Sequence, residues 1–267
     1  MWTKSKLHQL CLNALIVASE TISMLGSSGK TEVVDNDAVN TSTKADHAVS
    51  EALCKFFQES GIPADLYSEE LGIINTKNPQ FIIMWDDIDG TENWRRSNGT
   101  MPCCTIISIF DASGLFGHCL VTVLKEYNSG LIWSAVQGQG CWLGQEKCQT
   151  SHCVELTKKT AVRLDMYEMS DLPFLAPLNK KTWVKDAGST GYHCAAVSSG
   201  IADAFVGKSC KSYEIGVAFL VIEAGGFVSD WQGNSYSNVV LEFNGKYPVV
   251  CAATEELGKK ILKEINQ

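Results

Sequence analysis

The sequence predicts a mixed protein of the α+β and α/β classes, in which helices are layered against β-sheets. Two observations favour this class. Two amphipathic helix patterns followed by short apolar strands fill the first part of the chain, and the later part alternates strand and helix patterns. We therefore predict an N-terminal α+β half, residues 1–145, and a C-terminal α/β half, residues 146–267.

The N-terminal half should place two helices over a mostly antiparallel sheet. Apolar residues from Leu7 to Leu25 fall on one helical face, but polar residues interrupt the stretch, so neither a signal peptide nor a membrane span is expected. A second helix is predicted over residues 46–57, with Thr43 as its cap and Asp46 in its first turn. Strand patterns follow at residues 81–84, 105–110, 115–124 and 131–136.

The C-terminal half is predicted from the alternation of its patterns. The order is a strand at residues 161–164, a helix from Tyr192, a strand at 202–206, a helix from Glu214, a strand at 249–253 and a helix at 255–265. An active site is expected between the two halves.

Composition and charge limit the partners of this chain. Its 267 residues are 45% hydrophobic and carry a formal net charge of -8, with no run of Lys or Arg longer than two, which argues against binding a nucleic acid polymer. The eleven cysteines form no Cys-x-x-Cys pair, so we predict buried free thiols in a reducing, cytoplasmic compartment. A small anionic partner would need a metal to bind.

The most informative motif is Trp-Asp-Asp-Ile-Asp-Gly-Thr at residues 85–91, directly after an apolar run. A buried strand that ends here would place Asp86 at the carboxyl end of a sheet, where ligand sites of α/β folds tend to lie. Asp89 would turn inward across a tight bend, the Ile88 carbonyl would add a neutral oxygen, and Glu69 would return from the preceding segment. Hard oxygen ligands of this kind suit Mg²⁺.

The end of the same motif fits a phosphate. Gly90 permits close backbone approach, and the N–H groups of Gly90 and Thr91 would hold phosphate oxygens if a short helix starts there. The Thr91 hydroxyl would then be free to orient a water. The same residues also fit an acidic surface turn, because Asp and Gly are common in turns.

Further motifs accompany this one along the chain. They are Thr43-Lys-Ala-Asp46, Glu69-Glu70, the Asp86–Thr91 motif with Asn93, the hairpin at 137–144, Gly188-Ser189-Thr190, and the segments 200–204 and 223–226. In this order they resemble the inositol monophosphatase family of metal-dependent, lithium-sensitive phosphatases. The resemblance spans roughly residues 5 to 265 and implies an α-β-α-β-α layered sandwich, similar to inositol monophosphatase and fructose-bisphosphatase.

The resemblance also implies roles for individual residues. Asp46 and Thr91 would position the attacking water, and Glu70 would be a further catalytic group. Two or three Mg²⁺ ions would bind, one at Glu69, Asp86 and the Ile88 carbonyl, another at Asp86, Asp89 and Glu214. Substrate contacts would come from Gly90, Thr91, Ser189, Thr190 and Lys208. Family members are often dimers, so a homodimer is an expectation.

The late metal ligand departs from the family pattern. Where the family has Trp-Asp, this chain has Tyr213-Glu214. Counting forward from Asp203 places Glu214 at the ligand position, whereas counting back from Gly225-Gly226 places Tyr213 there. Glu214 is the preferred ligand; the alternative is an acidic residue placed at a helix start by the helix dipole.

Two more departures concern charge and substrate. Asp87 stands where the family has proline and would add negative charge beside the metals, and the glutamate by which animal inositol monophosphatases contact substrate is Gly207 here. Four basic residues have two alternative roles, binding a second phosphate or a carboxylate, or serving only solubility; they are Arg95, Arg96, Lys208 and Lys211.

The predicted function is therefore Mg²⁺-dependent hydrolysis of a small phosphorylated metabolite by a metal-activated water. The preferred substrate is an inositol or sugar monophosphate. The alternative substrates within the family are fructose-1,6-bisphosphate, histidinol phosphate and a 3′-phosphoadenosine nucleotide. An alternative of another class is a metal-binding regulatory relative with little catalysis, suggested by the altered residues Asp87 and Glu214.

Overall fold

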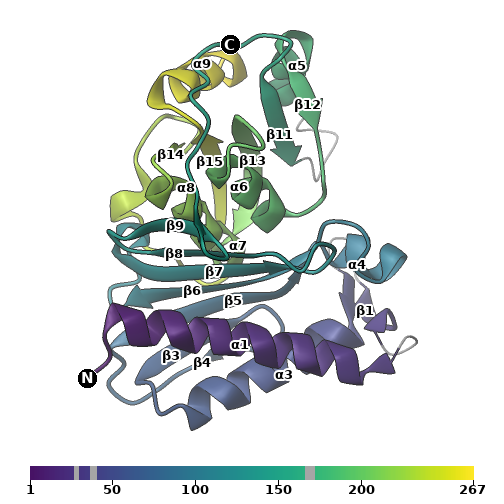
Figure 1. Cartoon of the computed structure of the whole chain (residues 1–267), viewed down its shortest axis with the longest axis vertical. Coiled ribbons are helices and arrows are strands. Elements are labelled where there is room, and N and C mark those ends of the chain that lie inside the picture. Colours follow the sequence, from purple (N-terminus) through teal and green to yellow (C-terminus); the bar gives the residue numbers. More distant parts are fainter. Residues whose placement is uncertain (27–29, 37–40, 166–171) are drawn as a thin grey trace.

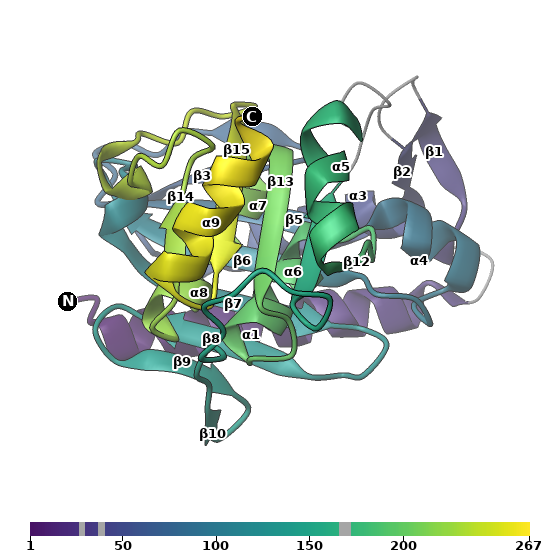
Figure 2. The ribbon, with the colours of Figure 1, turned by 90° about the horizontal axis from the view of Figure 1, so that it is seen from above.

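The computed structural model describes residues 1–26, 30–36, 41–165 and 172–267, and it stacks helices, sheet, helices, sheet and helices in five layers (Figure 1). This confirms the predicted layered sandwich. The first helical layer holds α1 (Lys4–Met24) and α3 (Lys44–Glu59), and the middle layer holds α6 (Thr190–Ser198), α7 (Ser212–Ile215) and α8 (Phe219–Glu223). The last layer holds α5 (Leu172–Lys181) and α9 (Glu255–Ile265), which cover the outer face of the second sheet (Figure 2).

The two N-terminal helices form as the sequence predicts. The Thr3 side chain caps α1, and its apolar face packs in one core cluster with α3 and the first sheet. At the start of α3, the Thr43 hydroxyl accepts from a helix N–H while the Asp46 carboxylate accepts from the Thr43 N–H at 2.8 Å. This reciprocal cap satisfies N–H groups that a helix start leaves unpaired. It also fixes the Asp46 side chain in place.

The first sheet has eight strands in the order β10-β9-β8-β7-β6-β5-β3-β4. All neighbouring strands are antiparallel except β3 and β5, as predicted for this part of the chain. The predicted strand at 115–124 was wrong at its start, where residues 116–118 form a 3-10 helix, η1. The strands are β3 (Ala64–Ser68), β4 (Gly72–Ile74), β5 (Phe81–Asp89), β6 (Cys104–Asp111), β7 (Cys119–Glu126), β8 (Ile132–Val136), β9 (Gly140–Leu143) and β10 (Glu146–Lys147).

The second sheet has five strands in the order β12-β11-β13-β15-β14. Strand β11 is parallel to β12 and β13, and β15 is antiparallel to its two neighbours. The strands are β11 (Ala161–Asp165), β12 (Trp183–Lys185), β13 (Ala204–Lys211), β14 (Phe227–Ser229) and β15 (Lys246–Ala252). The alternation predicted β11, β13 and β15 but neither β12 nor β14, which are only three residues long.

Two predicted helices start earlier than their patterns indicated. The helix predicted from Tyr192 begins at Thr190 as α6, because the Ser189 side chain caps it. The helix predicted from Glu214 begins at Ser212 as α7 and continues through a 3-10 turn, η3 (Gly216–Ala218), into α8. No predicted pattern covered β1 (Val33–Asn36), β2 (Thr41–Thr43), β3, β4, β10, α5 or η4 (Tyr236–Asn238). The short helix considered after Gly90 forms as α4 (Thr91–Ser97).

Three further sequence expectations concern the whole chain. All eleven cysteines have free thiols, and only Cys54 and Cys153 are not fully buried. Within the described ranges, no helix is long and apolar enough to cross a membrane. The division into halves at residue 145 stays a prediction; β10, at residues 146 and 147, still belongs to the first sheet.

Candidate active site

A bulge near the end of β5 brings Asp86 and Asp89 together. The predicted strand end at residue 86 was wrong, because β5 continues to Asp89 with all nine residues buried. Residues three apart on a regular strand point to opposite faces. The pairing of β5 with β6 shifts register between Asp86 and Asp89, and such an irregularity lets both side chains turn to the same face.

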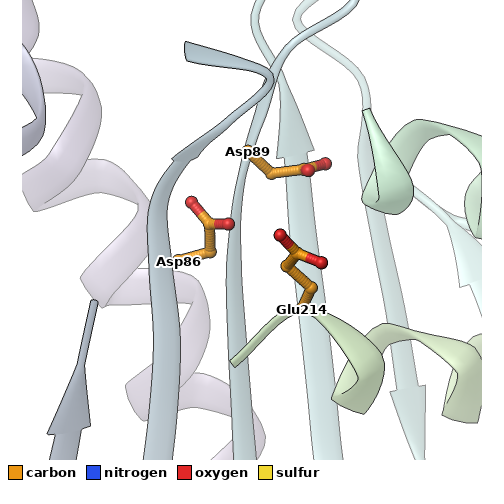
Figure 3. A group of neighbouring side chains, drawn as sticks. All are labelled: Asp86, Asp89 and Glu214. Atoms are coloured by element: carbon orange, nitrogen blue, oxygen red, sulfur yellow. The ribbon is translucent and has the colours of Figure 1, made fainter. Parts of the chain in front are cut away.

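These two aspartates meet Glu214 from the start of α7 (Figure 3). One carboxylate oxygen from each of the three lies within 4.8 Å of the others, and all three side chains are buried. Asp86 Oδ1 is buried without a hydrogen-bond partner. A buried carboxylate oxygen without a partner is costly unless a cation or proton satisfies it. The donor set is all oxygen, so it fits Mg²⁺.

The N-terminus of α6 holds Asp89. The Thr190 N–H donates to Asp89 Oδ1 at 3.1 Å, and the Gly191 N–H and the Ser189 hydroxyl donate to Oδ2 at 2.7 and 2.5 Å. A Cβ at Gly191 would lie 2.9 Å from Asp89 Oδ2 and 2.5 Å from Cys104 Sγ, so only glycine allows this approach. The Asp89 carboxylate is therefore held in one orientation before any ligand binds.

Glu69 and Tyr213 complete one side of the cluster. Glu69 directly follows β3 and neighbours Asp86, while the Tyr213 hydroxyl donates to Glu69 Oε1 at 3.1 Å. The two candidates for the late position therefore do different things. Glu214 joins the carboxylate cluster, and Tyr213 orients another predicted ligand.

Asp46 and Thr91 are in contact, as the resemblance implies. Thr91 Oγ1 lies 3.2 Å from Asp46 Oδ1 and 2.9 Å from the Ile88 carbonyl oxygen. Glu70 lies close to this pair. Burial is the main cause of the raised pKa of Asp46, and the charge of Glu70 raises it further. Its Oε2 is 3.2 Å from His47 Nε2 on α3. The three predicted catalytic residues thus lie close to one another.

Gly90 and Asn93 join the motif to the segment before α6. Gly90 has φ of +87°, and a Cβ there would lie 2.9 Å from the Gly188 carbonyl oxygen, so the motif needs glycine. The Asn93 side-chain amide donates to the carbonyls of Pro102 and Ala187 at 2.8 and 2.6 Å. These contacts fix the start of α4 against the loop that leads into α6.

Burial governs the electrostatics of the cluster. It is the largest cause of the raised pKa values of Asp86, Asp89 and Glu214, and neighbouring carboxylates raise those of Asp86 and Glu214 further. Burial likewise raises the pKa of Glu69 to about 8 and that of Asp46 to about 6. Without a cation, the site therefore favours bound protons.

We expect Mg²⁺ to stabilise the protein more at pH 8 than at pH 6. A carboxyl group whose pKa rises on folding contributes stability that is present below its unfolded pKa and lost as pH rises through its folded pKa. For Glu69 this window runs from 4.5 to about 8. Mg²⁺ must displace the proton that Glu69 holds at pH 6. Thermal unfolding with and without Mg²⁺ measures the difference, and an equal Tm increase at both pH values would contradict it.

Tyr213→Phe should raise the Mg²⁺ concentration needed for half-maximal activity. The change removes the donor to Glu69 but keeps the ring that packs near Phe243. Losing a group that orients a metal ligand costs about 10–100-fold in affinity or activity. Tyr236→Phe is a matched control, since the Tyr236 hydroxyl donates to the Pro248 carbonyl instead. Unchanged magnesium dependence in Tyr213→Phe would exclude this role.

The structure separates several other residues from the cluster. Arg95 and Arg96 both pair with Glu92 on α4, at 2.6 and 2.5 Å. Lys208 is half-buried on β13, where its contact with substrate stays a prediction. The Asp87 side chain accepts from the Trp85 indole at 2.8 Å, and burial raises its pKa. The negative charge that Asp87 would add beside the metals stays a prediction.

Sequence reasoning missed four contributors to the site. Gly191, Cys104 and the Tyr213 hydroxyl act through tertiary contacts, which no local pattern reveals. Asp165 is the last residue of β11, one position beyond the predicted strand end, and the Thr190 hydroxyl lies 3.2 Å from its Oδ2. Extending that strand by one residue would have identified Asp165 as a polar group at the carboxyl end of a strand.

The model of the inositol monophosphatase family matches residues 6–267. A fructose-1,6-bisphosphatase/inositol-1-monophosphatase from Methanothermobacter thermautotrophicus is 24% identical over 253 residues, which cover 91% of this chain and 90% of that protein. An inositol monophosphatase from Dictyostelium discoideum is 29% identical over 211 residues, 73% of this chain and 74% of that one. The bifunctional phosphatase IMPL2 from Arabidopsis thaliana is 25% identical over 264 residues, 95% of this chain and 73% of that protein.

Solved structures agree on the fold. The extragenic suppressor protein SuhB from Bartonella henselae superimposes with a TM-score of 0.85 at 17% identity, covering 98% of both chains. The inositol monophosphatase from Anabaena superimposes with a TM-score of 0.79 at 16% identity, covering 98% of this chain and 96% of that one. Since the family model also spans nearly the whole sequence, this chain belongs to the inositol monophosphatase family and is a phosphatase.

Proposed function

We propose that the chain is a Mg²⁺-dependent phosphomonoesterase that hydrolyses the monophosphate ester of an inositol or a sugar. The observation that carries this proposal is the buried cluster of Asp86, Asp89 and Glu214, in which Asp86 Oδ1 has no hydrogen-bond partner. Burial raises the pKa values of all three groups, and repulsion between carboxylates raises those of Asp86 and Glu214 further, so a divalent cation would stabilise their charged forms.

Two or three Mg²⁺ ions would bind to oxygen donors of the chain, and the residues name two sets of ligands. One set is Glu69, Asp86 and the Ile88 carbonyl, and the other is Asp86, Asp89 and Glu214. Bound Mg²⁺ would supply positive charge that lowers the pKa of a water and stabilises the leaving oxygen. The shared ligand Asp86 would keep both charges at one end of β5.

The other residues would position the reactants. The Thr91 hydroxyl can donate to Asp46, which leaves its oxygen free to accept a hydrogen bond from the attacking water. Glu70, beside His47, would act with this pair. The N–H groups of Gly90 and Thr91 would hold phosphate oxygens, and Ser189, Thr190 and Lys208 would lie on the leaving-group side. Water would attack phosphorus in line, without a covalent enzyme intermediate.

The names of the relatives include more than one phosphatase activity, so several phosphorylated compounds must be tested as substrates. One relative's name includes both fructose-1,6-bisphosphatase and inositol-1-monophosphatase, and another is named a bifunctional phosphatase. The test is phosphate release from inositol, sugar, histidinol and 3′-phosphoadenosine phosphates, each with Mg²⁺ or with a chelator. Mg²⁺-dependent release supports the proposal, whereas no release from any compound would favour the metal-binding regulatory alternative.

Three further properties belong to the proposal through the family resemblance. They are inhibition by lithium, a homodimeric state and a cytoplasmic location. Lithium titration of phosphate release and light scattering of the purified protein test the first two. Cell fractionation tests the third.

A further inference from the structure

Asp165 places an additional carboxylate beside the proposed metal site. Asp165 is the last residue of β11 and is only 5% exposed, similar to Asp89 at 4% and Glu214 at 8%. The Thr190 hydroxyl oxygen lies 3.2 Å from Asp165 Oδ2 and 3.5 Å from Glu214 Oε2. Because the Thr190 N–H also donates to Asp89, this single residue links Asp165 to two of the three clustered carboxylates.

The neighbouring strand contributes no side chain at this level. Asp165 pairs in parallel register with Gly207 on β13. A Cβ at Gly207 would lie 2.8 Å from Cys210 Sγ and 2.9 Å from Phe205 Cζ, so the packing leaves no room for a larger residue. Of the paired residues Asp165 and Gly207, only Asp165 therefore offers a polar side chain to a ligand.

The charge at this position selects against anionic groups. After burial and other contacts, the charge of Asp165 is among the causes that raise the pKa of Glu214. Arg95 and Arg96, two of the candidates for binding a second phosphate, are paired with Glu92. A carboxylate in such surroundings accepts hydrogen bonds from hydroxyl groups and repels another phosphate.

We propose that Asp165, oriented by Thr190, accepts a hydrogen bond from a hydroxyl of the leaving group and selects monophosphates of uncharged polyols. This inference rests on the proposed phosphatase function and adds a specificity-determining residue to it. The hydroxyl would lie between Asp165 and the Glu214 end of the cluster, where Thr190 connects the two.

The test compares two substrates that share a phosphate but differ in the leaving group. Inositol 1-phosphate offers hydroxyls, whereas p-nitrophenyl phosphate offers none. Asp165→Asn keeps the size of the side chain and an oxygen that can accept from Thr190. It should lower kcat/KM for inositol 1-phosphate about 10- to 100-fold, as expected for a hydrogen bond to a charged group. The value for p-nitrophenyl phosphate should fall much less, so the ratio of the two kcat/KM values should drop.

Asp203→Asn is the matched control, because the Asp203 carboxylate accepts from the Ala161 N–H at the other end of β11. It should change both substrates by the same factor. An equal loss on both substrates in Asp165→Asn would overturn the inference but leave the phosphatase proposal standing. No Mg²⁺-dependent release from either substrate by the wild type would instead overturn the phosphatase proposal.

A comparison on the wild type does not depend on any variant folding. The inference predicts a higher kcat/KM for inositol 1-phosphate than for fructose-1,6-bisphosphate. A preference for the bisphosphate would contradict it and would point to Lys208 as the reader of a second phosphate.

Discussion

Replacing Asp89 with asparagine is expected to lower kcat/KM for phosphate release by more than the roughly 10–100-fold that follows loss of a group merely supporting a metal ligand. The side chain accepts three hydrogen bonds from the start of α6. Asparagine would remove the charge and turn an amide NH₂ group toward one set of those donors. Both metal binding and the orientation of the site should suffer.

The measurement is initial-rate phosphate release over a range of Mg²⁺ concentrations, together with thermal unfolding. Asp111→Asn is the control, because the Asp111 side chain is 41% exposed and lies 2.8 Å from His118 Nδ1, at the end of β6 that pairs with Phe81 and not with Asp89. Asp89→Asn at wild-type rate would refute the assignment of Asp89 as a metal ligand.

Glu214→Gln should have the second largest effect, a loss of kcat/KM of at least about 10–100-fold with a raised Mg²⁺ requirement. Glutamine keeps the length of the side chain but removes the charge that closes the cluster with Asp86 and Asp89. Because α7 begins at Ser212, Glu214 lies in its first turn, where its Oε2 also accepts from the Lys211 N–H at 2.9 Å.

Comparison with Tyr213→Phe makes this prediction specific. If Glu214 binds metal and Tyr213 only orients Glu69, the Glu214 variant must be the more damaged of the two. Glu214→Gln with wild-type Mg²⁺ dependence would show that this carboxylate serves only the start of α7.

The site residues that the sequence predicted are those that lie together in short motifs. Residues 86–91 carry their ligands, a glycine with positive φ and a threonine in one segment, so the local pattern was enough to nominate Asp86, Asp89 and Thr91. The strand end could not be located in the same way. Whether β5 stops or bulges at Asp86 depends on its pairing with β6, which is a tertiary contact.

The remaining contributors depend on segments far apart in the chain. Tyr213 meets Glu69 across 144 positions, and Gly191 meets Asp89 across 102. Sequence periodicity reports which face of an element is buried, but not which side chain it meets there. The resemblance narrowed the late position to Tyr213 or Glu214, and only their packing separates the two roles.

The central claim is that a divalent cation binds between Asp86, Asp89 and Glu214. The most direct test is a crystal soaked in Mn²⁺, whose anomalous scattering marks the ion, with Mn²⁺-supported phosphate release measured on the same protein. A peak bridging the three carboxylates, absent in Asp89→Asn, is the predicted result. Mn²⁺-dependent activity with no peak at these carboxylates would contradict the account.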